Sequence, residues 1–282
     1  MSRTGCSLDE ADHRDALASG QGASPRDPAT ARMVSHASGS GRSDGWTEQT
    51  AVGIRPGVGQ DEGQKTMAKP TVPGTATDDE VRALLVRYRC PVPFHEVRTR
   101  FLGNIASPGM GVSPIKVVES LWGGKLPEFE TIDAANELVG ALVMGLWNRL
   151  SRHQDRNAPF RLTRIETGAT REGLAALAML RRQELEGFVE GLFGKEEVLD
   201  FPERAHRGLG ALSEMWALFE GTEVVAREET KPGTVPDMEK TLRLLRQMTK
   251  DAEHEIHAIL LSCKRARGQM IASLPAPKPT LH

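Results

Sequence analysis

The chain has 282 residues, which is enough for one or two domains, and its 36 basic and 38 acidic residues give a net charge of -2. This balance excludes a strongly basic or strongly acidic protein overall. The three cysteines, Cys6, Cys90 and Cys263, lie far apart, which excludes a disulfide framework and a CxxC metal site. The N-terminus has no signal-peptide h-region, and no segment approaches the ~18 consecutive apolar residues of a membrane span. We therefore expect a soluble protein of the reducing cytoplasm, with no membrane partner.

Residues 1–76 differ from the rest of the chain in composition. They contain 11 of the 28 glycines, only seven Leu, Ile or Val residues, and no Phe or Tyr. So little apolar surface cannot offset the entropy of ordering, which predicts a disordered extension. The extension is either a tail that recruits partners or, for residues 1–66, a segment that the cell does not make, because Met67-Ala68-Lys69-Pro70 is an alternative start.

Two short helices are expected next. Thr77 and Glu80 have the spacing of a capping box, which predicts a helix over 78–88. Apolar residues at intervals of three and four predict a second helix over about 94–105, after the Pro-containing break at 90–93.

The stretch 108–153 organises the chain. Ser113 and Pro114 have the pattern of an N-cap and first helical residue, Trp122 closes that short helix, and Gly123 with Gly124 stops it. Thr131 then caps a long helix.

The long helix is apolar on two faces, which is typical of a helix at the centre of a core. Trp147 is expected to be buried, so that truncating it to Ala costs roughly 3–5 kcal/mol. Asn148 is either a buried amide that is bonded to neighbouring backbone, which we favour, or a ligand contact.

The remaining chain predicts a polar connection over 151–170 and three further helices. They cover about 171–193, 203–220 and 237–267. Gly187 and Gly191 lie four apart, which indicates close approach of another helix. The last helix is either a coiled-coil dimer seam or a helix that lies on its own domain. The fold expected is thus all-α, one domain of six to seven helices over 77–270, with a disordered Pro-rich tail over 271–282.

The candidate chemistry is sparse. His254 and His257, with Glu253 on the same helix, are the best metal candidates, but we favour a solvated charged face. Cys90 and Cys263 are expected to be small buried hydrophobes rather than nucleophiles. The basic cluster 264–267 ends the predicted last helix, where cations suit the negative end of the helix dipole. No catalytic residue, cofactor site or metal site is predicted.

A set of residues spread over roughly 81–219 resembles the YecA/YgfB-like family of uncharacterised bacterial proteins. The pattern consists of "FLG", "SP…LWGG-LPEFE", "WN-L" and a later Gly-Phe-x-x-Gly turn. Its main residues are Ser113, Pro114, Trp122, Gly123, Phe129, Trp147, Asn148, Gly187, Phe188 and Gly191. The resemblance implies an all-helical fold and a poorly defined cellular role for the protein. It also implies that these residues are structural. Some family members have a C-terminal Cys-rich metal-binding segment, which this chain lacks.

Three functions follow as hypotheses, in this order. The first is a non-enzymatic, regulatory or protein-interaction module that binds an unidentified cytoplasmic protein, for which a hydrophobic surface groove without convergent ionisable groups would be the sign. The second is a metal-dependent enzyme that uses the His254/His257 region. The third is association with RNA or the ribosome through arginines of the 151–170 connection, Arg152, Arg156 and Arg161, and the basic cluster 264–267.

Overall fold

The computed structural model describes residues 76–109, 113–194, 199–228 and 237–274, and within these ranges it is all-helical, without strands. The α-helices are α2 (Asp78–Arg87), α3 (Phe94–Ala106), α4 (Pro114–Ser120), α5 (Ile132–Val139), α6 (Asn148–Ser151), α7 (Arg171–Phe193), α8 (Glu203–Arg227) and α9 (Met238–Ser273). A π-helix, η1 (Gly140–Trp147), makes α5 and α6 one continuous rod, and a 3-10 turn, η2 (Arg152–Gln154), follows it. Seven helices result, which confirms the predicted fold class. The residues of the predicted extension before Ala76, Met67 among them, lie outside the described part of the chain.

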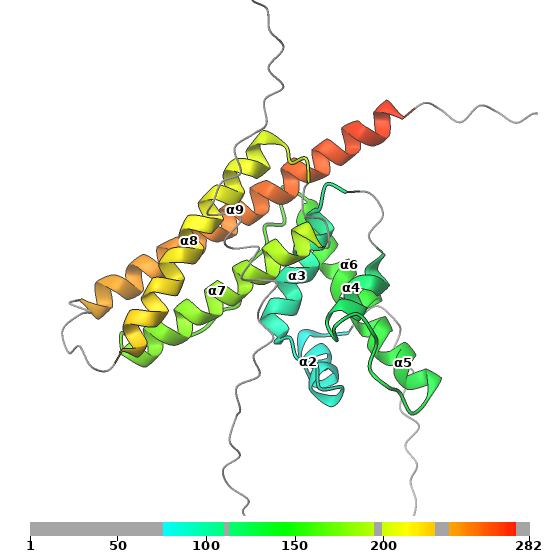
Figure 1. The fold of residues 1–282 in the computed structure, drawn as a ribbon, viewed down its shortest axis with the longest axis horizontal. Coiled ribbons are helices and arrows are strands. Elements are labelled where there is room, and N and C mark those ends of the chain that lie inside the picture. Colours follow the sequence, from blue (N-terminus) through cyan, green and yellow to red (C-terminus); the bar gives the residue numbers. More distant parts are fainter. Residues whose placement is uncertain (1–75, 110–112, 195–198, 229–236, 275–282) are drawn as a thin grey trace, which may run out of the picture.

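Three long helices form the main body. Figure 1 shows α7, α8 and α9 side by side, with successive helices running in opposite directions, and α3 crossing α7. The smaller helices α2, α4, α5 and α6 gather at one side of α3. The apolar stripe predicted for the last helix is buried in this body, as Ile256 and Cys263 show with no exposed surface. α9 therefore lies on its own domain, as the second of the two alternatives predicted.

The helix starts follow the local sequence in most cases. Thr77 and Glu80 form both bonds of the predicted capping box, and Thr131 accepts a hydrogen bond from the backbone N–H of Ala134. Ser113 does precede Pro114 at the start of α4, but its hydroxyl makes no capping hydrogen bond. Helix α4 also ends two residues before Trp122, at Ser120.

Glycines allow α3 and α7 to pack at backbone contact. A Cβ on Gly191 would lie 1.9 Å from the carbonyl oxygen of Arg100, and one on Gly103 would lie 2.0 Å from the carbonyl oxygen of Phe188. A Cβ on Gly187 would lie 2.7 Å from the Thr99 hydroxyl. The close approach predicted from the glycine spacing is thus confirmed, and its partner is α3.

The long central helix differs from its prediction in two ways. Its middle third is π-helical, which the apolar pattern did not indicate. Trp147 is half-buried, in edge contact with Phe101, and Asn148 is exposed and donates to the carbonyl of Met144 within the same helix. The burial predicted for Asn148 is wrong because the buried face of the rod follows Leu142 and Leu146 instead.

The last two helices are longer than predicted. α8 ends at Arg227 rather than near 220, and α9 ends at Ser273 rather than near 267. The first residues of the predicted Pro-rich tail are therefore helical. The basic cluster 264–267 lies more than one turn before the helix end, so the dipole explanation for it is wrong.

Candidate functional site

The predicted connection after the central rod is a strap, residues 155–168, that begins with a turn over 155–158 and then lies across α3, α7 and α9 without helix or strand. It follows α9 in the opposite direction, as three contacts show. Lys264 donates to the carbonyl of Gln154 over 3.0 Å just before the strap, His257 lies 3.4 Å from the carbonyl of Arg156, and Arg246 donates to the carbonyl of Thr167 over 3.3 Å. The contacts span 18 residues of α9, which is about 27 Å of helix.

Buried charged side chains hold the backbone of the strap. Glu253 accepts from the backbone N–H of Leu162 over 3.0 Å and pairs with Arg161 over 2.6 Å. We expected Glu253 on a solvated side of the last helix, and this is wrong, because the strap covers it.

A second pair holds the next residue of the strap. Glu184 accepts from the backbone N–H of Thr163 over 2.7 Å, and Arg181 donates to the carbonyl of Thr163 over 2.6 Å while pairing with Glu184. Buried backbone groups need partners, so these charges let an extended segment lie inside a helical protein.

One aromatic side chain fixes the start of the strap in the core. Phe160 has no exposed surface, and it lies between the His153 ring at 5.3 Å and the Arg98 guanidinium at 5.1 Å. Burial lowers the pKa of His153, although its contact with the Ala158 carbonyl opposes this effect. A lowered pKa favours the neutral ring, which suits packing against Phe160.

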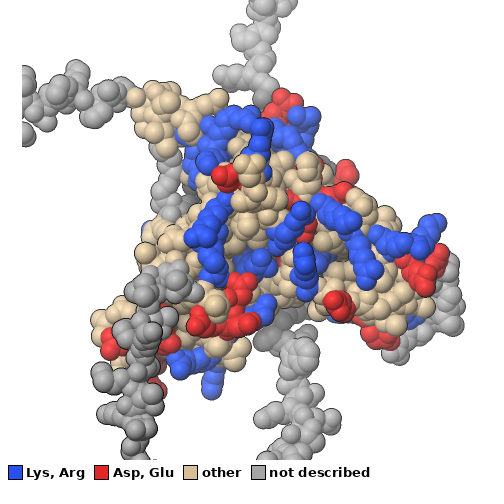
Figure 2. All heavy atoms as spheres, turned by 180° about the vertical axis from the view of Figure 1, so that it is seen from behind, with Lys and Arg blue, Asp and Glu red and all other residues tan. Residues whose placement is uncertain are grey.

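Exposed cations follow the strap and the neighbouring side of α9. We call this set the basic track; it comprises Arg152, Arg156, Arg164, Arg243, Lys250, Lys264 and Arg265. Arg243, Lys250, His257 and Lys264 recur at intervals of seven residues, which puts them on one side of α9. Within the described residues, no member of the track forms an ion pair. Figure 2 shows Lys and Arg side chains over much of the upper and central rear face, with Asp and Glu mainly toward its lower and right edges.

A surface hollow lies at one end of the basic track. Its volume is about 450 Å³. The residues that line it come from both segments and are Gln154, Asp155, Arg156, Leu261, Lys264 and Arg265. We call this the basic hollow. The fold thus brings together the two regions named in the RNA hypothesis, the arginines after the central rod and the cluster 264–267.

Two cations of that hypothesis have structural partners instead. Arg161 pairs with Glu253, and Arg267 donates to the carbonyls of Ile105 and Ser107 at the end of α3. Arg267 therefore caps another helix.

The metal candidates do not assemble with further ligands. His254 is exposed, His257 faces the strap, and Glu255 pairs with Arg204 over 2.7 Å. In the part of the chain that the structure describes, no three His, Cys, Asp or Glu side chains come together as metal ligands would.

The described cysteines lie in apolar surroundings. Burial raises the pKa of the Cys263 thiol to about 11, and it also raises the pKa of Cys90, so neither is activated as a thiolate. Cys90 is half-buried and Cys263 is fully buried.

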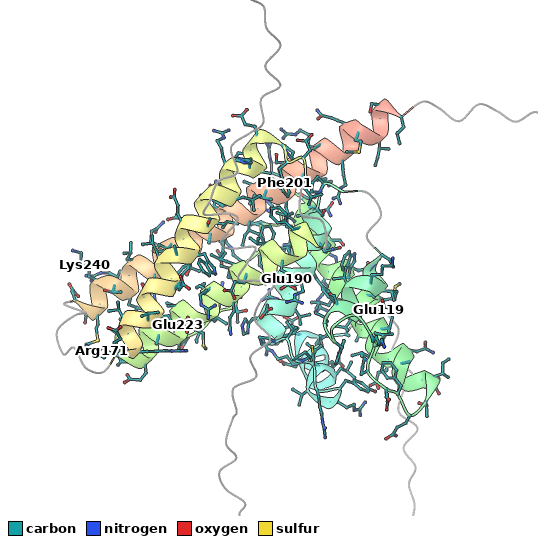
Figure 3. All side chains as sticks on the ribbon, viewed as in Figure 1. Glu119, Arg171, Glu190, Phe201, Glu223 and Lys240 are labelled. Carbon is teal, nitrogen blue, oxygen red and sulfur yellow. The ribbon has the colours of Figure 1, made fainter. Side chains whose placement is uncertain are left out.

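A second charged cluster lies between α3 and α7. Arg100 donates to Glu96 over 2.8 Å and to Glu190 over 2.5 Å, and Figure 3 shows Glu190 on the stretch of α7 beside α3. Burial, and to a lesser degree the charge of Glu190, raises the pKa of Glu96 to about 7 against the opposing effect of Arg100. Burial likewise raises the pKa of Glu190. These ionisable groups connect helices and line no described cavity.

Most residues of the family-like pattern have packing roles. Trp122 donates to the carbonyl of Tyr88 over 2.9 Å, and Phe129 makes an edge contact with the Tyr88 ring at 5.2 Å. Gly123 has a φ of 75°, which an L side chain rarely adopts. Phe188 has no exposed surface. Most residues of the pattern therefore take part in packing or in a turn, and none of them belongs to the basic track.

Comparison with protein-family models, with curated proteins and with solved structures found no match. The family resemblance stays a prediction. Among the described helices, none combines the length and the apolar character that a membrane crossing requires.

Sequence reasoning missed Arg243 and Lys250, and it missed that Glu184, Arg181 and Glu253 hold the strap. The seven-residue interval from Arg243 to Lys264 was visible in the sequence and would have indicated one basic side of α9. The roles of the buried carboxylates had no such signal, because their partners are backbone groups of a distant segment.

Proposed function

We propose that this protein is a non-enzymatic cytoplasmic binding module that binds RNA through the phosphate backbone along the basic track. The observation that supports the proposal is the convergence of unpaired cations from the strap and from α9. Arg156 and Arg265 are 109 positions apart in the chain, yet they line one hollow. A basic stripe of this kind is the electrostatic footprint of a nucleic-acid-binding surface.

The composition of the track favours phosphate over an acidic protein. Five of its seven cations are arginines, whose planar guanidinium groups match phosphate oxygens in bidentate fashion. Protein interfaces instead concentrate aromatic and apolar side chains at their centre. Phe160 is the one aromatic residue of the strap, and because it is fully buried it is not available as such a centre.

The test is fluorescence anisotropy of the full chain with a labelled single-stranded RNA at several salt concentrations. We expect affinity to fall with salt with a log–log slope of about -0.7 per phosphate contact. The R156E/R265E double variant should bind at least about tenfold more weakly, because each contact to a charged group contributes more than a neutral one. The matched control is K116E/K125E, which makes the same charge change at two exposed residues of the α4 region.

Three results would overturn this proposal. The first is binding that does not change with salt. The second is binding that R156E/R265E and K116E/K125E weaken equally. The third is equal competition by polyglutamate and by unlabelled RNA, which would assign the track to an acidic protein segment.

A separate observation favours a protein partner as a second candidate function. The buried stripe of α9 continues past the body, since Ile256, Cys263 and Met270 are seven residues apart but Met270 is 43% exposed. Ile271 and Leu274 are exposed beside it, at 58% and 54%, and Figure 1 shows this helix end projecting from the body. Exposed apolar surface on a helix is typical of an interaction site.

The charge of this helix end favours an acidic amphipathic helix of another protein as the occupant. No Asp or Glu follows Glu255 in the chain, while the basic cluster 264–267 directly precedes the exposed apolar residues. A photo-crosslinker at Ile271 in cells should react with an acidic amphipathic segment of one partner. Crosslinks to a second copy or to RNA alone would contradict this assignment.

A further inference from the structure

The basic hollow lies at one end of the basic track, between residues 154–156 and residues 261–265 of α9. The hydrogen bond from Lys264 to the carbonyl of Gln154 joins its two sides. Its volume of about 450 Å³ is within the range of small-ligand sites, and it exceeds what a single phosphate group fills. The hollow therefore has room for a phosphate together with part of the sugar or base that carries it.

The residues that line the hollow carry a net positive charge that suits a dianion. Arg156 and Arg265 are exposed and form no ion pair within the described residues, and Lys264 uses one N–H of its three on Gln154. One carboxylate, Asp155, lines the same hollow, and its Oδ1 accepts from the backbone N–H of Asn157 over 2.8 Å. Three cations and one carboxylate leave two positive charges.

A terminal phosphate matches this excess better than an internal one. A phosphomonoester has a charge of about -1.5 to -2 at neutral pH, since its second pKa is about 6, whereas each backbone phosphodiester carries a single negative charge. A phosphomonoester also presents three terminal oxygens, enough for the two guanidinium groups and the ammonium. Leu261 supplies an apolar wall for the sugar next to the phosphate.

We propose that the basic hollow binds the terminal phosphomonoester of a nucleic acid strand, with Arg156, Arg265 and Lys264 as the phosphate ligands. This inference rests on the proposed RNA binding and assigns one end of the track to one end of the strand. The same chemistry is found in a free nucleoside monophosphate, so the experiment separates the two sources.

The experiment measures binding of three otherwise identical RNA oligonucleotides, with a 5′ phosphate, with a 3′ phosphate or with neither, and of a nucleoside monophosphate. We expect one phosphorylated oligonucleotide to bind about tenfold more tightly than the unphosphorylated one, because hydrogen bonds to charged groups are the strong ones. The variant R265Q should remove that preference. Lys250 lies in the middle of the track, so the matched variant K250Q should weaken the binding of all three oligonucleotides by the same factor. It should keep the preference for the phosphorylated oligonucleotide.

The outcomes separate the inference from the function on which it rests. Equal, salt-dependent binding of the three oligonucleotides would overturn the terminal-phosphate site and leave RNA binding intact. Binding of the monophosphate alone, lost in R265Q, would overturn both RNA binding and the strand end as the ligand, and it would assign the hollow to a free nucleotide. A preference that survives R265Q would also overturn the assignment, because the terminal phosphate would then lie elsewhere.

Discussion

The α3–α7 crossing and the basic track use charged residues in opposite ways. At the crossing, Arg100 is paired twice, with Glu96 and Glu190, and the helix backbones touch through Gly191. On the track, Arg156 and Arg265 have no ionic partner in the described residues and lie at the surface. A charge that stabilises the fold is paired and buried, whereas a charge that is left unpaired beside a hollow is available to a ligand. Variants in the two regions should therefore separate stability from binding.

The largest effect is expected from G191A at the crossing. Its Cβ would lie 1.9 Å from the carbonyl oxygen of Arg100, so the two helix backbones must separate. We expect a loss of at least about 3 kcal/mol in the free energy of unfolding, measured by urea denaturation. The control is G221A in α8, where an added Cβ meets nothing within 4 Å and should stabilise by about 0.5–1 kcal/mol. Equal effects of the two variants would show that the crossing is not closely packed.

The next effect concerns the strap, which links the two regions. E253A removes the acceptor of the Leu162 backbone N–H and leaves Arg161 without its carboxylate. We expect a loss of about 2–3 kcal/mol and faster amide hydrogen exchange around Leu162. The exposed Glu166 lies in the same strap, so E166A is the control and should change neither quantity. Unchanged exchange at Leu162 in E253A would mean that other contacts hold the strap.

The pH dependence of stability should come from the crossing. The pKa of Glu96 is raised to about 7 from an ordinary value of 4.5, so the folded state binds a proton more readily than the unfolded chain does. The free energy of unfolding should therefore be greatest near pH 5, the acid end of the range between the two pKa values. It should fall, by on the order of 2 kcal/mol, as the pH rises through about 7. Thermal unfolding between pH 5 and 8 measures the slope, and E96Q should flatten it. A slope that is identical in E96Q would exclude Glu96 as its source.

The sequence predicted the crossing better than it predicted the strap, for a physical reason. Gly187 and Gly191 are four residues apart on one helix, so a local pattern contained the information that a helix approaches there. The capping box of Thr77 and Glu80 is local in the same sense, and it is confirmed. The helix period likewise indicated the buried stripe of α9.

The strap and the basic hollow depend on pairs that are far apart in the chain. Glu253 bonds a backbone N–H 91 positions away, and a backbone group has no sequence signature that identifies its partner. The same limit made the region after the central rod look like a solvated connection, although Phe160 and Leu162 are buried. The cations of the hollow were named as candidates, but only the fold shows that Arg156 and Arg265 line one hollow.

The smallest effect on stability is expected where the effect on binding is largest, in R156Q/R265Q. Both side chains are exposed and unpaired within the described residues, so their neutralisation should change the free energy of unfolding by no more than about 0.5 kcal/mol. RNA affinity should fall, and the slope of its salt dependence should decrease by about 0.7 for each phosphate contact that is lost. Urea denaturation and salt-dependent anisotropy on the same preparation give both numbers. A loss of stability above about 1 kcal/mol would mean that these cations support the fold, as Arg100 does, because an exposed cation without a partner has no contact whose loss could cost that much.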